Sequence, residues 1–286
     1  MSEALPPLPP VLYDGLVRDA LREDLGRAGD LTTDATVPEG IRALARLRAR
    51  VEGRVAGLSA ALHAFRVLDP EAEIEIEVGD GHDVEAGQDL ARVRGDARAL
   101  LTAERTALNL LGHLCGIATT TRTLVRAVEG TAAKIACTRK TTPLLRALEK
   151  YAVRCGGGSN HRYGLDDAIM IKDNHRVLAG GAAEAVRRAK QHVGHLVKIE
   201  VEVDTLDELE ALMALGVDVV LLDNMDPETL RRAVAIVDGR AVTEASGGIT
   251  PDTAAAIAAS GVDLLSVGWL THSAPCLDVG LDLETL

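Results

Sequence analysis

Aromatic side chains are scarce in this sequence: Phe, Trp and Tyr together make up 2% of the residues. Proteins that bind single-stranded nucleic acid stack bases on such rings and carry basic surfaces. This chain instead has a formal net charge of -12. A nucleic-acid partner is therefore not expected.

Paired cysteines and long apolar runs are missing as well. Cys115, Cys137, Cys155 and Cys276 form no CxxC pair, which argues against a zinc site and against a disulfide framework. The opening MSEALPPLPPV lacks the pattern of a signal peptide, and no later run approaches the roughly 18 apolar residues of a membrane span. We expect a cytoplasmic protein with no membrane partner.

The hydrophobic content, 47% of 286 residues, is enough to fill a sizeable core. The first hundred residues begin with an amphipathic segment, VLYDGLVRDALREDLG, and continue with strand-like stretches such as ARLRARVEGRVAGL and EAEIEIEVGDG. This order predicts a small α+β domain with an antiparallel sheet. VGDGHDVEAGQDLARV is similar to a lipoyl-type hairpin, but it has no lysine at its tip, so a structural turn is favoured.

After a helical stretch over 101–128, the pattern changes to an apolar run, a polar end and a helix, repeated six times. The runs are AKIACTRK, DAIMIKDN, VKIEVEVD, VDVVLLDN, AVTEASGG and DLLSVGWL. Helical segments such as TLDELEALMALG and DPETLRRAVAIV separate them. Six β/α units in series predict a parallel sheet that is closed or nearly closed into a barrel.

Positive charge is concentrated where this repeat begins. Between Lys134 and Arg176 there are nine Lys or Arg and four acids, a local charge of +5, so the remainder carries -17. Solvated helix faces explain Arg146, Lys150 and Arg154, which are spaced at i, i+4 and i+8. The other cations need a different explanation.

Polar side chains end each apolar run, and α/β barrels place their active sites at that edge of the sheet. Cations come first, acids next and small residues last. In chain order they are Arg139 and Lys140, Lys172, Glu202, Asp223, Ser246 with Gly247, and Gly268. Because guanidinium and ammonium groups bind carboxylates and phosphates, the pattern indicates an anionic ligand.

Some of these positions allow two interpretations. Glu202 and Asp223, one β/α step apart, suit a magnesium ion that bridges to phosphates, but they would equally suit pairing with nearby lysines. Ser246, Gly247 and Gly248 precede a helix start, where free N–H groups favour a phosphate. His161, in the glycine-rich loop RCGGGSNHRYGLDD, would by itself be read as solvated.

Taken together, several motifs resemble the quinolinate phosphoribosyltransferase family, the decarboxylating nicotinate-nucleotide pyrophosphorylases of NAD synthesis. The motifs are ACTRKTTPLLRALEKYAVRCGGGSNHRYGLDDAIMIKDNH, IEVEVDTLDE, VVLLDN, SGGIT and GVDLLSVGWLTHS, and LLTAERTALNLLGHLCGIAT extends them upstream. The resemblance covers most of the chain.

The resemblance implies an incomplete parallel α/β barrel with an N-terminal α+β sandwich-like domain. We place that domain at 1–105, rejoined by 273–286, and the barrel at 106–272. The family joins quinolinate to phosphoribosyl pyrophosphate with Mg2+, releasing pyrophosphate and carbon dioxide, and works as a homodimer with sites between subunits.

The resemblance also implies roles for individual residues. Arg105, Arg139 and Arg162 would bind the quinolinate carboxylates, with His161 and Lys172 in the same pocket. Lys140, Glu202 and Asp223 would be catalytic, and the two acids would hold the metal, partly through water. The substrate-binding set is Arg105, Thr138, Arg139, Lys140, His161, Arg162, Lys172, Glu202, Asp223, Ser246, Gly247, Gly248, Val267 and Gly268.

One position departs from the pattern of the family: Leu144 stands where glycine is expected after TRKTTP, and we expect no effect on the cations. Two alternatives stay open. One is a related pyrophosphorylase of molybdenum-linked operons, and the other is a noncatalytic sensor of phosphorylated sugars on the same fold.

Overall fold

The structure is a computed structural model that describes residues 5–286. The chain forms two compact units. The first contains the chain up to Arg122, together with Thr141–Gly157 and Leu270–Leu286. The second contains Thr123–Lys140 and Gly158–Trp269.

The first unit is built on an antiparallel sheet with the strand order β12-β1-β5-β3. In β1, alternation turns Ala43, Ala45 and Leu47 into the core and leaves Arg46 and Arg48 on the other face. The predicted antiparallel sheet is thereby confirmed. Its strands are β1 (Arg42–Ala49), β3 (Glu73–Ile76), β5 (Asp89–Asp96) and β12 (Val279–Thr285), and β2 (Gly53–Arg54) pairs separately with β4 (Asp83–Val84).

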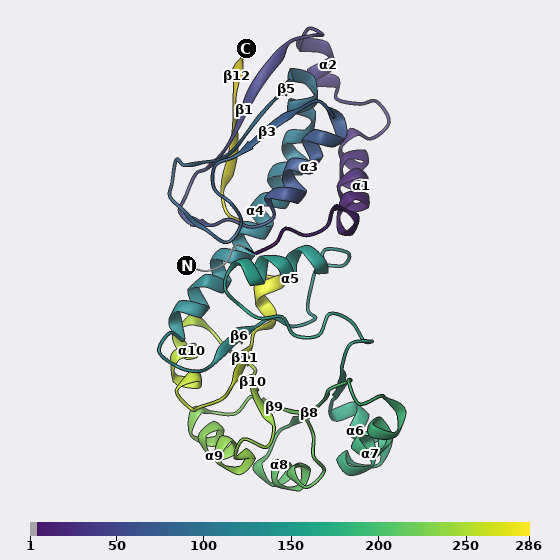
Figure 1. Cartoon of the computed structure of the whole chain (residues 1–286), viewed down its shortest axis with the longest axis vertical. Coiled ribbons are helices and arrows are strands. Elements are labelled where there is room, and N and C mark those ends of the chain that lie inside the picture. The colour runs from purple at the N-terminus through teal and green to yellow at the C-terminus, as the bar shows by residue number, and fades with distance from the viewer. Residues whose placement is uncertain (1–4) are drawn as a thin grey trace. The chain divides into compact units, whose positions relative to one another are not determined.

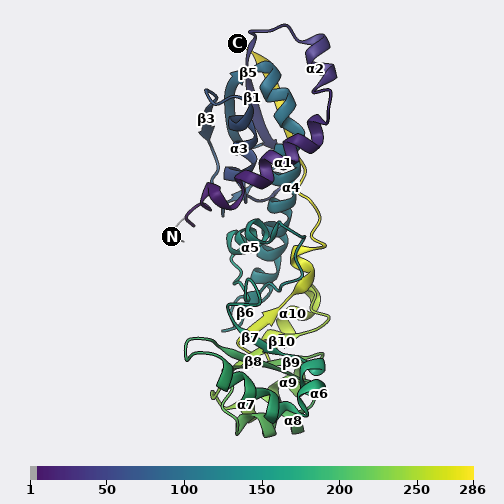
Figure 2. The ribbon, with the colours of Figure 1, turned by 90° about the vertical axis from the view of Figure 1, so that its right-hand side faces the viewer.

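Helices cover the buried face of this sheet (Figures 1 and 2). The carboxylate of Asp80 accepts a hydrogen bond from Leu58 N–H at the start of α3, and Phe65 of that helix is fully buried. His63 of α3 contacts Asp14 of α1 at 2.7 Å. The helical elements are η1 (Pro10–Leu12), α1 (Asp14–Leu25), α2 (Leu31–Thr36), α3 (Leu58–Leu68), α4 (Ala97–Ala127) and α5 (Arg146–Cys155).

Helix α5 belongs to the first compact unit, although the sequence-based limits place it in the barrel domain. Two contacts hold it there. His113 Nε2 lies 2.8 Å from Glu149 Oε1, and Tyr151 donates its hydroxyl hydrogen to Asp80. The compact units therefore divide the chain differently from the predicted limits of 1–105 with 273–286 and 106–272, which stay a prediction.

The second unit contains a parallel sheet with the strand order β6-β11-β10-β9-β8-β7. Helices α8, α9 and α10 lie around the outside of its strands (Figure 1). The predicted incomplete α/β barrel is confirmed. Its strands are β6 (Lys134–Ala136), β7 (Ile169–Ile171), β8 (Ile199–Val203), β9 (Val219–Asp223), β10 (Val242–Ser246) and β11 (Leu264–Ser266).

The connections between these strands are mostly helical. They are α6 (Asp173–Ala179), α7 (Ala182–His192), α8 (Leu206–Met213), α9 (Pro227–Val237) and α10 (Pro251–Ala258), and η2 (Gly268–Thr271) follows β11. Among residues 5–286, no helix combines the length and the apolar character that crossing a bilayer would need.

Candidate active site

The strand register of the second unit places three of the predicted site residues, Glu202, Asp223 and Ser246, on one face of its sheet. Ser246 is level with Asp223 on β9 and with Ser266 on β11, and Glu202 is level with Leu221. Because side chains two residues apart on a strand share a face, Glu202 and Asp223 lie on the same side of the sheet. The chain thus presents two carboxylates and a hydroxyl at the carboxyl ends of three adjacent strands.

The cationic end of β6 packs against the segment that follows β11. Lys140 N–H donates to the Thr138 hydroxyl at 3.0 Å, and Val267 N–H donates to the carbonyl of Ala136 at 2.9 Å. A Cβ added to Gly268 would lie 2.8 Å from Cδ of Lys140. Gly268 therefore leaves room for the aliphatic part of the Lys140 side chain. Thr138 and Lys140 both lie beside Gly268.

The acids at the ends of β8 and β9 have partners within the chain. Lys172, directly after β7, pairs with the carboxylate of Glu202, which is 8% exposed. Asn224 donates its side-chain amide to Asp223 at 2.6 Å. Glu202 thus makes the lysine contact that was the alternative to magnesium binding, and it lies on the same side of the sheet as Asp223 of the neighbouring strand.

The glycines after β10 form a tight turn. Gly247 has φ +97°, and a Cβ there would lie 2.0 Å from Oδ1 of Asn224, so no larger residue fits. Trp269 donates its indole N–H to the Ile249 carbonyl at 2.8 Å, which fixes this turn to the segment after β11. The glycine turn immediately before α10 is therefore close to the segment after β11 that contains Gly268.

The glycine-rich loop continues the barrel beside β6. Ser159 exchanges backbone hydrogen bonds with Ile135 and Cys137, at 2.7 and 3.1 Å. The loop thereby brings Arg162 toward Arg139: burial lowers the pKa of the Arg162 guanidinium, and the charge of Arg139 lowers it further. Two cations whose charges repel in a partly buried place are suited to a dianionic ligand.

Two acids that were not predicted from the sequence lie deeper on the same face. Glu200 and Glu244 are 5% and 1% exposed, and both contact His161, at 2.9 and 3.6 Å. Burial and the charge of Glu200 raise the pKa of Glu244 to about 7. Their alternation with Glu202 and Ser246 along the strands was a signal that could have identified them.

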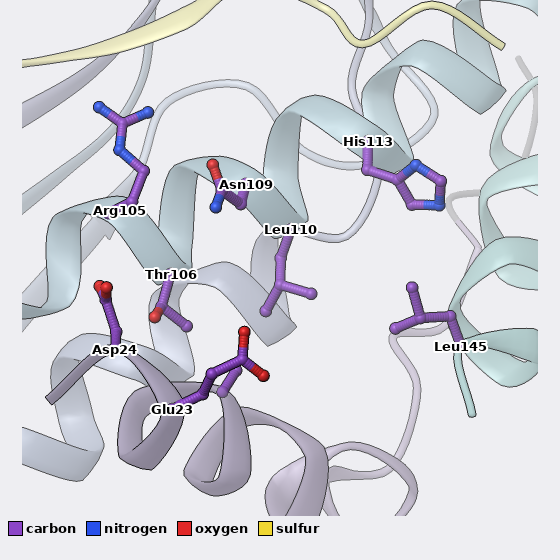
Figure 3. A pocket seen from close by; sticks show the side chains of 9 residues that line it. Glu23, Asp24, Arg105, Thr106, Asn109, Leu110, His113 and Leu145 are labelled. Carbon is purple, nitrogen blue, oxygen red and sulfur yellow. The ribbon is translucent and has the colours of Figure 1, made fainter. Parts of the chain in front are cut away.

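Arg105 lies in the first compact unit, on α4, and its side chain is 63% exposed. The nearest carboxylate is that of Glu104, at 3.9 Å. Together with Glu23 and Asp24 of α1 and His113 of α4, it lines an open hollow of about 400 Å³ (Figure 3). Its predicted contact with the ligand stays a prediction.

Leu144 has a left-handed backbone, φ +69°, and is 91% exposed. Glycine adopts this conformation without steric cost, whereas leucine does not. The departure noted in the sequence therefore lies at a position whose backbone suits glycine.

A barrel whose strand ends gather cations, carboxylates and glycine turns defines a class of protein: an α/β-barrel enzyme for anionic, phosphate-bearing substrates. Two family models match the chain. Quinolinate phosphoribosyl transferase, N-terminal domain, matches residues 30–115, and quinolinate phosphoribosyl transferase, C-terminal domain, matches residues 117–282. The chain belongs to the quinolinate phosphoribosyl transferase family.

Similar proteins carry consistent names. The nicotinate-nucleotide pyrophosphorylase [carboxylating] of Mycobacterium leprae is 47% identical over 275 residues, covering 93% of this chain and 95% of its own. A probable enzyme of the same name from Bacillus subtilis is 44% identical over 261 residues, covering 91% and 90%. The crystal structure of NadC from Streptococcus pyogenes aligns with a TM-score of 0.95 at 39% identity, covering 99% of this chain and 100% of that one.

Proposed function

We propose that this chain transfers the phosphoribosyl group of phosphoribosyl pyrophosphate to quinolinate, releasing pyrophosphate and carbon dioxide and forming nicotinate mononucleotide for NAD synthesis. One observation carries the proposal. The second unit places Arg139, Lys140, Arg162 and Lys172 around one end of a barrel whose inner face bears Glu202 and Asp223. A pyridine dicarboxylate and a polyanionic sugar repel each other, so binding them side by side requires such a set of cations.

The chemistry follows from this placement. Arg139 and Arg162 hold the carboxylates of the base, with its ring nitrogen toward C1 of the ribose. The nitrogen attacks C1 as the C1–O bond to pyrophosphate breaks, and Lys140 neutralises the departing charge. The carboxylates of Glu202 and Asp223 stabilise the positive charge that develops on the sugar.

Decarboxylation needs no further group from the protein. After transfer, the ring nitrogen is a pyridinium, and its positive charge stabilises the electron pair that stays on C2 when the C2–carboxylate bond breaks. Carbon dioxide departs, and C2 takes up a proton from water. The turn at Gly247 and Gly248, before α10, supplies backbone N–H groups for the 5'-phosphate, together with Ser246, Val267 and Gly268.

Magnesium belongs to this proposal. Glu202 and Asp223 offer hard carboxylate oxygens on adjacent strands, which is the donor type that Mg2+ prefers, and Lys172 can leave Glu202 for an anionic ligand. When bound, Mg2+ would neutralise part of the pyrophosphate charge. Glu202→Ala and Asp223→Ala should therefore raise the magnesium concentration needed for half-maximal rate. Unchanged magnesium titrations for both variants would assign these acids a structural role only.

We also propose a homodimer in which Arg105 completes the quinolinate pocket of the partner subunit. Its high exposure and single weak ion pair leave the guanidinium accessible for such a contact. Inactive Arg105→Ala mixed with inactive Lys140→Ala should regain activity on subunit exchange, because each heterodimer then contains one intact site. Exchange verified by mass spectrometry without regained activity would contradict the contact.

A cytoplasmic location completes the proposal. Within the described residues the four cysteines form no disulfide, as expected in a reducing compartment.

Detection of nicotinate mononucleotide made from quinolinate tests the proposed function directly. Nicotinate should be a far poorer substrate, because it leaves part of the cationic pocket unmatched. Equal catalytic efficiency with the two bases would refute the assigned use of the arginines, and no product from either base would refute the function.

A further inference from the structure

The contacts around His161 determine which of its ring nitrogens carries hydrogen. The backbone N–H of Arg162 donates to Nδ1 at 2.8 Å, so Nδ1 acts as an acceptor. A neutral imidazole has a single N–H, which must then be on Nε2. Nε2 lies 2.9 Å from Oε2 of Glu200, at the right distance to donate that hydrogen.

Each of the two buried glutamates has one carboxylate oxygen without a hydrogen-bond partner. Oε1 of Glu200 and Oε1 of Glu244 have no hydrogen-bond partner among the described residues, and both side chains are more than nine-tenths buried. One ligand oxygen or nitrogen of His161, Glu200 and Glu244 each lies within 4.8 Å of the others. Protonation of one of the two carboxyl groups would give an orphaned oxygen a hydrogen to donate.

A metal ion is the other candidate for this cluster. It would need the lone pair of Nε2, because Nδ1 already faces the N–H of Arg162. The neutral ring cannot offer both lone pairs, and an imidazolium can offer neither. The geometry therefore favours a proton between the carboxyl groups.

We propose that Glu244 is a neutral carboxylic acid whose hydrogen goes to Glu200, and that this pair is a positioning device for His161. Glu200 holds the ring as the neutral tautomer with hydrogen on Nε2, which leaves Nδ1 to anchor the backbone of Arg162. Glu244 carries the proton because it is the more deeply buried acid, whereas Glu200 receives the imidazole N–H.

The surroundings of Glu244 agree with this assignment. Glu200 faces it from β8, His161 from the loop before β7, and the Ser266 hydroxyl from β11. Beyond them on the same face, Glu202 is occupied by Lys172, and Lys134 of β6, in the row of Glu244, is exposed. Burial and the charge of Glu200 favour the neutral form of Glu244, and they outweigh the opposite effects of His161 and of the hydrogen bond from Ser266.

The consequence concerns the base pocket, and this part rests on the proposed function. Arg162 is fixed by its backbone N–H on His161 and by its Nη1, which donates to the Ala168 carbonyl at 2.8 Å. Glu244, Glu200 and His161 therefore position the guanidinium of Arg162, which binds quinolinate. His161 itself contributes no positive charge, so it is a positioning residue and the arginines supply the charge.

The tautomer can be read without any substrate. Nitrogen NMR of the protein labelled with ¹⁵N-histidine, with His161 assigned by its loss in His161→Asn, should show an unprotonated Nδ1 and a protonated Nε2 at pH 7. Infrared difference spectra of wild type minus Glu244→Gln should show the carbonyl band of a carboxylic acid. An imidazolium at His161, or the absence of that band, would overturn the proposal.

Kinetics give a second, independent test. The side-chain oxygen of Asn can take the place of Nδ1, whereas the amide of Gln reaches the place of Nε2. His161→Asn should therefore keep the quinolinate KM within about threefold, and His161→Gln should raise it by about tenfold, the effect of one lost hydrogen bond. The KM for phosphoribosyl pyrophosphate should stay unchanged in both.

The reverse order of the two variants would mean that His161 binds quinolinate directly through Nε2. A rise in melting temperature with Zn2+ that Glu244→Gln abolishes would mean that the cluster is a metal site. Either result overturns the proposal. If the wild type forms no nicotinate mononucleotide, the proposed function fails while the spectroscopic tests still decide the state of Glu244 and His161.

Discussion

On the exposed face of the sheet in the first unit, Arg48 meets Asp89 at 2.7 Å and Arg50 meets Asp282 at 2.6 Å. In the second unit the sheet instead buries Glu200 and Glu244 beside one histidine. The Arg50–Asp282 pair contributes little, because water already solvates both partners. Burying a carboxylate is costly, so a chain that buries Glu200, Glu202 and Glu244 on one face of the sheet has a chemical use for that face. The charges of the first sheet thus lie on a solvated surface and stabilise little, whereas the buried charges of the second sheet build a site.

The largest effect is expected at Lys140, in the second unit. Lys140→Ala removes the cation assigned to the leaving pyrophosphate, so turnover should fall by about a hundredfold or more. Quinolinate binding, measured by calorimetry, should be nearly retained. Lost affinity with unchanged turnover would reverse the assignment and would make Lys140 a ligand for the base.

Glu244 should make the stability of the second unit depend on pH. Its pKa is raised in the folded chain, so between about pH 4.5 and 7 the folded state holds a proton that the unfolded state releases. The stabilisation that this group contributes is fully present below about pH 4.5 and is lost as the pH rises to about 7. The free energy of unfolding should fall by up to about 3 kcal/mol over this range.

Glu244→Gln has no such proton to lose. Urea titrations at pH 5 and pH 7.5 should therefore show wild type losing stability relative to the variant at the higher pH. Equal differences at both values would mean that Glu244 is ionised in the folded chain.

Gly247 tests whether the turn after β10 tolerates a side chain. Gly247→Ala forces a Cβ against Asn224 and keeps a left-handed φ, so it should lower the free energy of unfolding by about 2 kcal/mol. Gly248→Ala is the matched control: it also has a positive φ, but no atom lies within 4 Å of its Cβ. Equal losses in the two variants would show that backbone strain alone, without the clash, sets the cost.

The smallest effect is expected in the first unit. Arg50→Ala breaks an ion pair whose partners are each more than a third exposed, so thermal unfolding should reveal a loss below about 1 kcal/mol. Activity should be unchanged. Asp282→Ala should behave in the same way, and a loss of activity in either variant would show that this surface also serves the site.

Much of the architecture was readable from residue patterns. Strand-like stretches such as ARLRARVEGRVAGL predicted an antiparallel sheet, and six apolar runs with polar ends predicted parallel strands with a site at one edge. Periodicity works here because strand and helix geometry repeat locally. The domain limits were harder to read, because the membership of α5 depends on His113 and Asp80, residues distant in the chain.

The sequence by itself determined the fold class, the family and the residue types at the strand ends, because strand period and motif spacing are local properties of the chain. Only the tertiary structure revealed that Glu200, Glu244 and His161 meet, since they come from two strands and a loop up to 83 positions apart, from His161 to Glu244. Their protonation states are decided by burial and by the groups opposite them. Those are consequences of three-dimensional packing, which no single segment of the chain encodes.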